Sequence, residues 1–436
     1  MKQLIHTLEG RLEPLPVSVA VELPSGQRVG KSSTQVLLRF RSLAPLAALA
    51  AGHIGTLGAA VVEGQVELEG RVRDIMRAAS ALLQSDPVRG TPSWWSQIMA
   101  RTRSMALHTL TRDAEQVQFH YDLSDDFYAL WLDPRRVYSC AYYREPGMDL
   151  AQAQEAKLDH ICRKLQLHPG ERFLDIGAGW GGLLLWAAEH YGVKAHGITL
   201  SRNQHAYVNQ LIQQRGLQDR MHIELCDYRE LQPDKAFDKI ASVGMFEHVG
   251  QAHMPEYGDT VCRLLKPGGM ALIHGITAGG VNNVAVGAGM GEFIDRYIFP
   301  GGELLHVSKV LQALSQSGLE MVDTENLRPH YARTLWAWSD ALEAQLPQAE
   351  RILAAQTDAE RGARALRAYR LYLAGCAMGF ERGWIALHQM LVTHPDGQLS
   401  SGPMVGAQSA YPFNREYIYT QGVSCPTSSN PVPPPI

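Results

Sequence analysis

A carboxylate and an imidazole follow a buried strand in FDKIASVGMFEHVG, residues 237–250. The apolar run 240–246 predicts that strand, which makes Glu247 a candidate general base with His248 as its obvious partner. A second imidazole, His274, ends the apolar stretch MALIH. Because parallel strands present their carboxyl ends at one edge of a sheet, we expect Glu247 and His274 to lie close together.

A glycine-rich turn follows another predicted strand in FLDIGAGWGG, residues 173–182. Gly177, Gly179 and Gly182 fit G-x-G-x-x-G, in which glycine lets the backbone turn sharply and pass close to a ligand. The pattern alone would also suit a dinucleotide. The turn therefore predicts a nucleotide-like cofactor without identifying it.

Three neighbouring features favour S-adenosylmethionine over a dinucleotide. Asp175 precedes the first glycine, as in S-adenosylmethionine-dependent methyltransferases. Thr199 and Gln204 stand where the ribose of NAD would need an acidic residue. Asp227 follows a third strand, where it can hold an adenine amine, and LLKPGGMALIH supplies the Lys-Pro-Gly-Gly turn that such methyltransferases often carry. We therefore predict a methyltransferase rather than an oxidoreductase.

Short apolar strands alternate with helical stretches in the middle of the chain, and these elements must position the candidate residues. Such alternation is typical of βαβ units and predicts a Rossmann-like α/β fold with a parallel, doubly wound sheet. Residues 303–395 are predicted to be mainly helical. Near the N-terminus, a strand over 61–70 and a helix over 71–83 are predicted. The central strands are expected at residues 172–176, 194–198, 222–225, 239–244 and 270–274.

Composition describes a globular chain of 436 residues, with 45% hydrophobic residues and a net charge of −4. This charge argues against a protein that works by coating nucleic acid. Six cysteines without a CxxC pair indicate reduced thiols in a cytoplasm and no metal site. Residues 43–62 are interrupted by Pro and Gly, so we expect a short buried helix ending at Gly52 rather than a membrane span.

The chain divides into four predicted segments. A small α+β domain with a lipid-binding or dimerisation role is expected over residues 1–90, and a methyltransferase domain over 119–398. A linker with an amphipathic helix joins them over 91–118, and a tail over 399–436 ends in disorder. Tryptophans and basic residues of the linker suit an anionic membrane surface, although a helix packed on its own domains is the simpler interpretation.

Several motifs between about residue 118 and residue 385 resemble those of cyclopropane-fatty-acyl-phospholipid synthases. The most specific pair is YSCAYY, residues 138–143, and GMFEHVG, residues 244–250. Ala178 departs from the cysteine that many members carry, and its small size should preserve the turn. The N-terminal segment is similar to the small domain of the longer bacterial members. The other motifs are QFHYDLSDDFYALWLDPRRV, LDIGAGWGG, YIFPGGELL, HYARTLWAW and YLAGCAMGFERG.

The resemblance implies methyl transfer from S-adenosylmethionine to a cis double bond of an acyl chain esterified in a phospholipid. A carbocation forms, and loss of a proton from the transferred methyl closes a cyclopropane ring. Such a site must exclude water and surround the cation with aromatic faces. The aromatic candidates are Phe127, Tyr128, Trp131, Tyr138, Tyr142, Tyr143 and Phe246.

The resemblance also implies that a bound bicarbonate ion is the base. Its ligands map onto Cys140, Glu247, His274 and Tyr331, with a backbone contact at Ile276. Glu247 would accept the bicarbonate proton while His274 and Tyr331 donate, and His248 would point elsewhere and fix the turn. Cys376 matches a cysteine proposed as catalytic, but its small neighbours favour packing or lining of the acyl channel. The implied cofactor contacts are Tyr138, Ser139, Asp175, Gly177, Gly179, Thr199, Gln204, Asp227 and Tyr228.

The resemblance further implies a homodimer in the cytoplasm, bound peripherally to the inner face of a bacterial membrane. Three alternatives stay open. A related enzyme would leave a methyl- or methylene-branched chain without closing the ring. A heteroatom methyltransferase would act on a soluble small molecule and would not need phospholipid vesicles. A lipid-binding protein with an inactive methyltransferase domain would not bind the cofactor.

Overall fold

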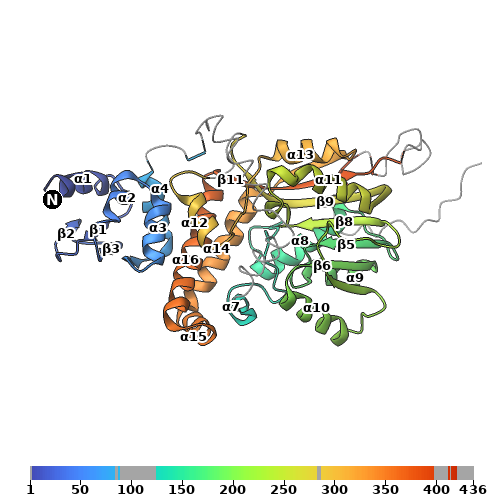
Figure 1. Cartoon of the computed structure of the whole chain (residues 1–436), viewed down its shortest axis with the longest axis horizontal. Coiled ribbons are helices and arrows are strands. Elements are labelled where there is room, and N and C mark those ends of the chain that lie inside the picture. Colours follow the sequence, from blue (N-terminus) through green and yellow to red (C-terminus); the bar gives the residue numbers. More distant parts are fainter. Residues whose placement is uncertain are drawn as a thin grey trace, which may run out of the picture.

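The computed structural model describes residues 2–83, 87–88, 124–281, 286–396, 411–412 and 414–419. The predicted linker and its amphipathic helix, and nearly all of the C-terminal tail, lie outside these residues. The described chain is elongated, with a small sheet at one end, a large sheet at the other and long helices between them (Figure 1). Among the described helices, none combines the length and hydropathy that crossing a membrane requires.

The large sheet contains seven strands in the order β10–β11–β9–β8–β5–β6–β7. The five predicted strands are confirmed and form its parallel part. β11 pairs antiparallel with both of its neighbours, so the sheet is mixed rather than wholly parallel. The strands are β5 (Arg172–Ile176), β6 (Lys194–Thr199), β7 (Met221–Leu225), β8 (Phe237–Val243), β9 (Leu265–Ala278), β10 (Glu320–Asn326) and β11 (Ile385–Thr393).

Helices cover both faces of this sheet. Successive residues of a strand point to opposite faces, so Phe173 and Leu174 enter different cores. The core around Phe173 is covered by α8 (Leu150–Lys164), α9 (Gly182–Tyr191) and α10 (Arg202–Gln214). The core around Leu174 is covered by α11 (Met254–Leu264) and α13 (Val307–Gln316).

The segment 303–395 is mainly helical, as predicted, but it also contributes β10 and β11. β10 has the sequence EMVDTEN and is largely half-buried, so it shows little apolar alternation. β11 is an apolar run that directly follows a long helix, so the sequence does not mark where the strand begins. The remaining elements are α7 (Asp125–Ala129), the 3-10 turns η1 (Phe246–His248) and η2 (Gln251–His253), α12 (Met290–Tyr297), α14 (Arg328–Ala344), α15 (Leu346–Gln356), α16 (Ala359–Glu381) and α17 (Glu416–Tyr419).

Residues 2–83, here called the N-terminal unit, form a four-stranded sheet of order β2–β1–β3–β4 with four helices. Its elements are α1 (Lys2–Leu12), β1 (Val19–Glu22), β2 (Arg28–Gly30), β3 (Val36–Phe40), α2 (Leu46–Ala51), α3 (Ile54–Val62), β4 (Val66–Gly70) and α4 (Val72–Leu82). α2 stops at Gly52, as predicted. The strand predicted over 61–70 is wrong in its first half, because Val61 and Val62 end α3 and a turn at Gly64 precedes β4.

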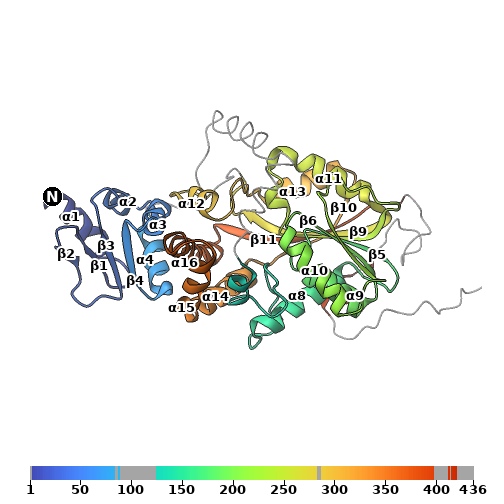
Figure 2. The same ribbon diagram turned by 60° about the horizontal axis from the view of Figure 1, so that its bottom comes forward.

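The N-terminal unit packs on the rest of the chain through α3 and α4. These helices lie against α12 and α16, and α16 separates them from the large sheet (Figure 2). The long helices between the two sheets therefore have one side facing the N-terminal unit and another facing the candidate site.

Candidate active site

The glycine-rich turn joins β5 to α9 and shapes a cavity of about 150 Å³ at the carboxyl edge of the sheet. Gly177 and Gly179 have φ angles of 82° and 55°, which other residues rarely adopt. Thr199 and Gln204 line the same cavity, and Thr199 Oγ1 donates to Gln204 Oε1 at 2.9 Å. The fold thus brings these four predicted cofactor residues to one cavity.

A buried lysine that sequence reasoning missed lies beside this cavity. Lys157 of α8 lines it together with Asp175, and its Nζ donates to Ser139 Oγ at 2.8 Å. Burial lowers the pKa of Lys157 to about 8 and raises that of Asp175 to about 7, and the attraction between the two groups opposes both effects. Lys157 lies on the buried face of α8 together with Gln154, His160 and Lys164, so the apolar periodicity of this helix does not single it out.

Two predicted cofactor residues lie away from the cavity. Both carboxylate oxygens of Asp227 accept hydrogen bonds from the Arg229 guanidinium, each at 2.8 Å. The Tyr228 ring meets Tyr257 edge-on inside the core. Neither residue is among the described residues that line the cavity. Their contacts with an adenine therefore stay predictions.

Glu247 lies on η1, the short turn that follows β8. Its Oε1 accepts from the backbone N–H of Ile276 at 2.7 Å, whereas the buried Oε2 has no partner within the described chain. Burial raises the pKa of Glu247 to about 7. Gly275 makes room for this carboxylate, because a Cβ there would lie 2.9 Å from both oxygens and 2.3 Å from the Phe246 ring.

His274 lies on β9, the strand next to β8, and is 1% exposed. Gln389 sits opposite it on β11, and the Gln389 amide nitrogen donates to His274 Nδ1 at 3.1 Å. This bond leaves the imidazole proton on Nε2, which has no partner among the described residues. Burial, reinforced by Lys157 and Lys164, lowers the pKa of His274 well below its ordinary value, so the ring is neutral.

Glu247 and His274 line one end of a second cavity, which measures about 300 Å³. It meets the smaller cavity at the glycine-rich turn, here called the cofactor cavity because the predicted cofactor residues line it. The residues that line both cavities are Tyr138, Ser139, Gly244 and His248. One carboxylate oxygen of Glu247 and one ring nitrogen of His274, neither with a partner among the described residues, therefore border one space. This pair suits a small anion that carries a proton of its own.

The other residues of the predicted anion site are only partly brought together. Tyr331 of α14 lines the large cavity. Cys140 is fully buried, its Sγ faces the backbone oxygens of Ala141 and Leu327, and it is not among the described lining residues. Burial raises the pKa of this thiol, so it is not a thiolate. The amide of Ile276 is already occupied by Glu247, so its direct contact with an anion stays a prediction.

Comparison with known families shows which protein family the chain resembles. The family model described as mycolic acid cyclopropane synthetase matches residues 108–390, more than half of the chain. This chain belongs to that family. A probable fatty acid methyltransferase of Pseudomonas putida is 42% identical over 90% of this chain and 96% of its own length. Cyclopropane mycolic acid synthase 1 of Mycobacterium tuberculosis is 38% identical over 63% of this chain and 94% of that one.

Solved structures agree with this assignment. Mycolic acid cyclopropane synthase CmaA1, complexed with SAH and CTAB, matches with a TM-score of 0.58 and 36% identity over 64% of this chain and 97% of that one. A coclaurine N-methyltransferase, 19% identical with a TM-score of 0.64, shares the fold alone. The predicted fold and family are therefore confirmed, and the chain is an S-adenosylmethionine-dependent methyltransferase of the cyclopropane synthetase family.

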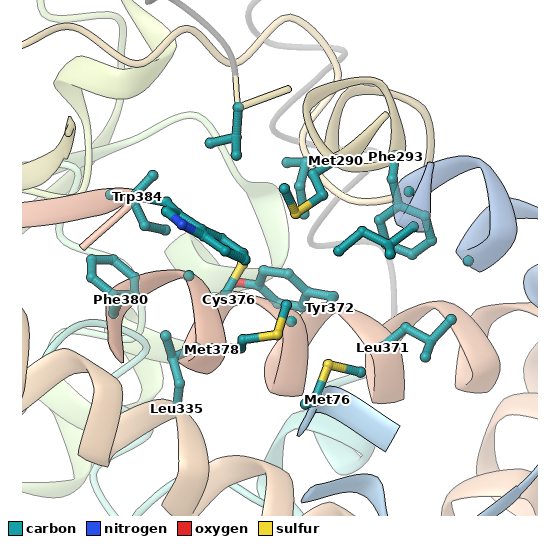
Figure 3. A pocket seen from close by; sticks show the side chains of 18 of the residues that line it. Met76, Met290, Phe293, Leu335, Leu371, Tyr372, Cys376, Met378, Phe380 and Trp384 are labelled. Atoms are coloured by element: carbon teal, nitrogen blue, oxygen red, sulfur yellow. The ribbon is translucent and has the colours of Figure 1, made fainter. Parts of the chain in front are cut away.

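The aromatic wall of the large cavity is built mainly by residues that were not predicted. Of the seven candidates, only Tyr138 is among the described residues lining the large cavity, and its hydroxyl donates to Tyr372 at 3.1 Å. Tyr142 and Tyr143 stack near His330 instead. The aromatic rings that do line the cavity with Tyr138 and Tyr331 are those of Phe293, Phe299, Tyr372, Phe380 and Trp384. Figure 3 shows Phe293, Tyr372, Phe380 and Trp384 around this space.

Two further predictions concern Cys376 and His248. Cys376 lines the large cavity close to Tyr372 and Trp384 (Figure 3), and burial raises its pKa to about 12. A neutral thiol in this place is suited to lining rather than to nucleophilic attack. His248, which we expected to point elsewhere, lines both cavities and meets Phe299 edge-on.

Proposed function

We propose that this protein transfers the methyl of S-adenosylmethionine to a cis double bond of an acyl chain in a membrane phospholipid and closes a cyclopropane ring. The observation that carries the proposal is the junction of the two cavities. There Glu247 Oε2 and His274 Nε2, both buried and without protein partners in the described chain, border a large apolar cavity next to the predicted methyl-donor site.

The smaller cavity fits the methyl donor. Gly177 and Gly179 let the backbone approach a nucleoside, while Thr199 and Gln204 offer polar groups. Tyr138 and Ser139 stand at the opening toward the large cavity. When bound, S-adenosylmethionine supplies an electrophilic methyl group, and these residues would direct it toward that opening.

The pair Glu247 and His274 supports bicarbonate as the base. A bicarbonate ion has one O–H to donate and further oxygens to accept, which matches an acceptor at Glu247 Oε2 and a donor at His274 Nε2. The carboxylate form of Glu247 is the one that can accept this proton, and with its pKa raised to about 7 by burial that form is present in part of the molecules near neutral pH. Tyr331 offers a further hydroxyl to the same cavity. Held there, bicarbonate would supply a base for the final proton.

The surroundings of the pair also suit a cationic intermediate. The neutral ring of His274 places no second positive charge beside the reacting carbon. Aromatic faces of Tyr331, Tyr372 and Phe380 border the cavity and can stabilise positive charge while excluding water. In this proposal the chain's residues mainly orient and shield, because the π bond needs no deprotonation before it attacks.

A methyl- or methylene-branched product is the second candidate. The Pseudomonas putida relative is named a probable fatty acid methyltransferase, a name that does not require ring closure. Either product would come from the same lipid. We propose further that the protein works as a homodimer bound peripherally at the inner face of the membrane, where that lipid is found.

The product identifies the reaction. Purified protein is incubated with S-adenosylmethionine and vesicles of monounsaturated phosphatidylglycerol, and the fatty acid methyl esters are analysed by gas chromatography–mass spectrometry and proton NMR. We expect a gain of one CH₂ together with the high-field resonances of a cyclopropane ring. Olefinic methylene signals would indicate the branched alternative, and absence of S-adenosylmethionine binding by calorimetry would indicate an inactive domain.

A further inference from the structure

The large cavity does not end in the methyltransferase domain. From Glu247 and His274 it passes along α16 and continues between α16 and the helices α3 and α4 of the N-terminal unit. Figure 3 shows Met76 of α4 facing Leu371 and Tyr372 of α16 across this space. It reaches the sheet of the N-terminal unit, where Val36 and Leu38 of β3 line it.

Polarity falls along the cavity from one end to the other. Its charged and hydrogen-bonding side chains, among them Ser139, Glu247 and His274, all belong to the methyltransferase domain. The described lining residues of the N-terminal unit are without exception Val, Leu, Ile, Met, Ala or Gly. A phospholipid head group would lose its hydration at this end without finding partners, whereas a hydrocarbon segment would be stabilised.

The N-terminal unit is held in a defined position, so its part of the wall has a defined shape. The Gly55 N–H donates to Ala288 O at 3.0 Å, and a Cβ on Gly55 would lie only 2.0 Å from the Gly289 backbone. Arg367 of α16 donates twice to Val62 O at the end of α3, at 2.9 and 2.7 Å. These backbone contacts leave little freedom for α3 to slide over its neighbours.

We propose that the N-terminal unit forms the blind end of the acyl-chain site and holds the segment between the double bond and the terminal methyl. The space bordered by α4 then limits the length of that segment, so the N-terminal unit selects which double-bond positions react. This inference rests on the proposed function, because it assumes an unsaturated acyl chain as the occupant.

Three natural acyl chains distinguish the methyl side of the double bond from its carboxyl side. Palmitoleoyl and oleoyl chains are identical on the carboxyl side, but oleoyl has two more carbons on the methyl side. Palmitoleoyl and cis-vaccenoyl chains are identical on the methyl side and differ on the carboxyl side. Competition among these chains in phosphatidylglycerol vesicles therefore reports which side of the chain a substitution obstructs.

The test variant is Ala79→Leu, which adds bulk to a residue of α4 that lines the cavity. Ala81→Leu is the matched control, because Ala81 lies on the same helix but is exposed. We expect Ala79→Leu to lower oleoyl turnover about tenfold relative to palmitoleoyl, the discrimination that two buried methylene groups supply. The ratio of cis-vaccenoyl to palmitoleoyl should stay within about twofold, and the control should change neither ratio.

Met76→Ala tests the opposite change in cavity size. It keeps the proposal testable if Ala79→Leu does not fold. It enlarges the same end of the cavity, so the share of oleoyl turnover should rise. Equal effects on all three chains, or a selective loss of cis-vaccenoyl, would overturn the assignment of the methyl-side segment to this unit. A wild-type protein that binds S-adenosylmethionine but leaves all three chains unchanged would instead contradict the proposed function.

Discussion

Replacing Glu247 by Gln tests the role of the carboxylate with little change in shape. Glutamine keeps an oxygen that can accept from the Ile276 amide, the bond that Oε1 makes at 2.7 Å. It places an NH₂ group where Oε2 lies buried without a partner in the described chain. The site then presents two donors, the introduced amide and the His274 ring, and no acceptor for the proton of a bicarbonate ion.

The size of the effect follows from that lost acceptor. A hydrogen bond to a charged group contributes about 1.5–3 kcal/mol, so the upper value corresponds to a fall in turnover of about 100-fold. Glu247 is not among the described residues lining the cofactor cavity. The dissociation constant of S-adenosylmethionine should therefore change by less than about twofold.

The free energy of unfolding of Glu247→Gln should rise, although its turnover falls. Burial raises the pKa of Glu247 from 4.5 to about 7, so the folded protein is destabilised as pH rises through this interval and the carboxyl loses its proton. At pH 8 the cost is at most about 3 kcal/mol, and glutamine removes it. We expect Glu247→Gln to raise the melting temperature at pH 8 but not at pH 4.5.

The assay combines turnover on phospholipid vesicles, calorimetric titration with S-adenosylmethionine and thermal unfolding at both pH values. Glu350→Gln is the matched control, because Glu350 is exposed on α15 and should change none of the three quantities. Equal losses of turnover and cofactor affinity would refute the placement of Glu247 at the anion site. An unchanged turnover would refute its role altogether.

Three further substitutions test the neighbours of Glu247. Cys376→Ala should retain turnover within about threefold, because a thiol with a pKa of about 12 is not a nucleophile at neutral pH; a loss above about 100-fold would restore a chemical role. Gln389→Leu should lower turnover about tenfold and alter its pH profile, since the proton on His274 is no longer directed to Nε2, while cofactor affinity stays unchanged. Gly275→Ala should abolish turnover and lower stability by about 1–3 kcal/mol, measured by denaturant unfolding, because the new Cβ displaces Glu247.

The pairing of Glu247 with His274 could be predicted because each residue follows a strongly apolar stretch, and these stretches form the neighbouring parallel strands β8 and β9. Gln389 could not, because its strand runs antiparallel and follows α16 with little interruption. The side chain that orients His274 therefore became visible only with the sheet order.

Local pattern could not reveal the features that depend on long-range packing. Met76 and Ala79 lie in the helix predicted over residues 71–83, and nothing in their spacing indicates that they border the same cavity as Glu247. The extent of that cavity depends on how the N-terminal unit docks on α16, which the periodicity of single elements does not encode.

Cyclopropane formation as a function of bicarbonate tests the central claim most directly. Enzyme, vesicles and buffer are freed of carbon dioxide, bicarbonate is added back in steps, and ring product is measured by gas chromatography–mass spectrometry. The proposal predicts low turnover without bicarbonate and a saturable recovery, with no recovery in Glu247→Gln. Full turnover of the wild-type protein without bicarbonate would contradict it and assign the final proton to a protein base.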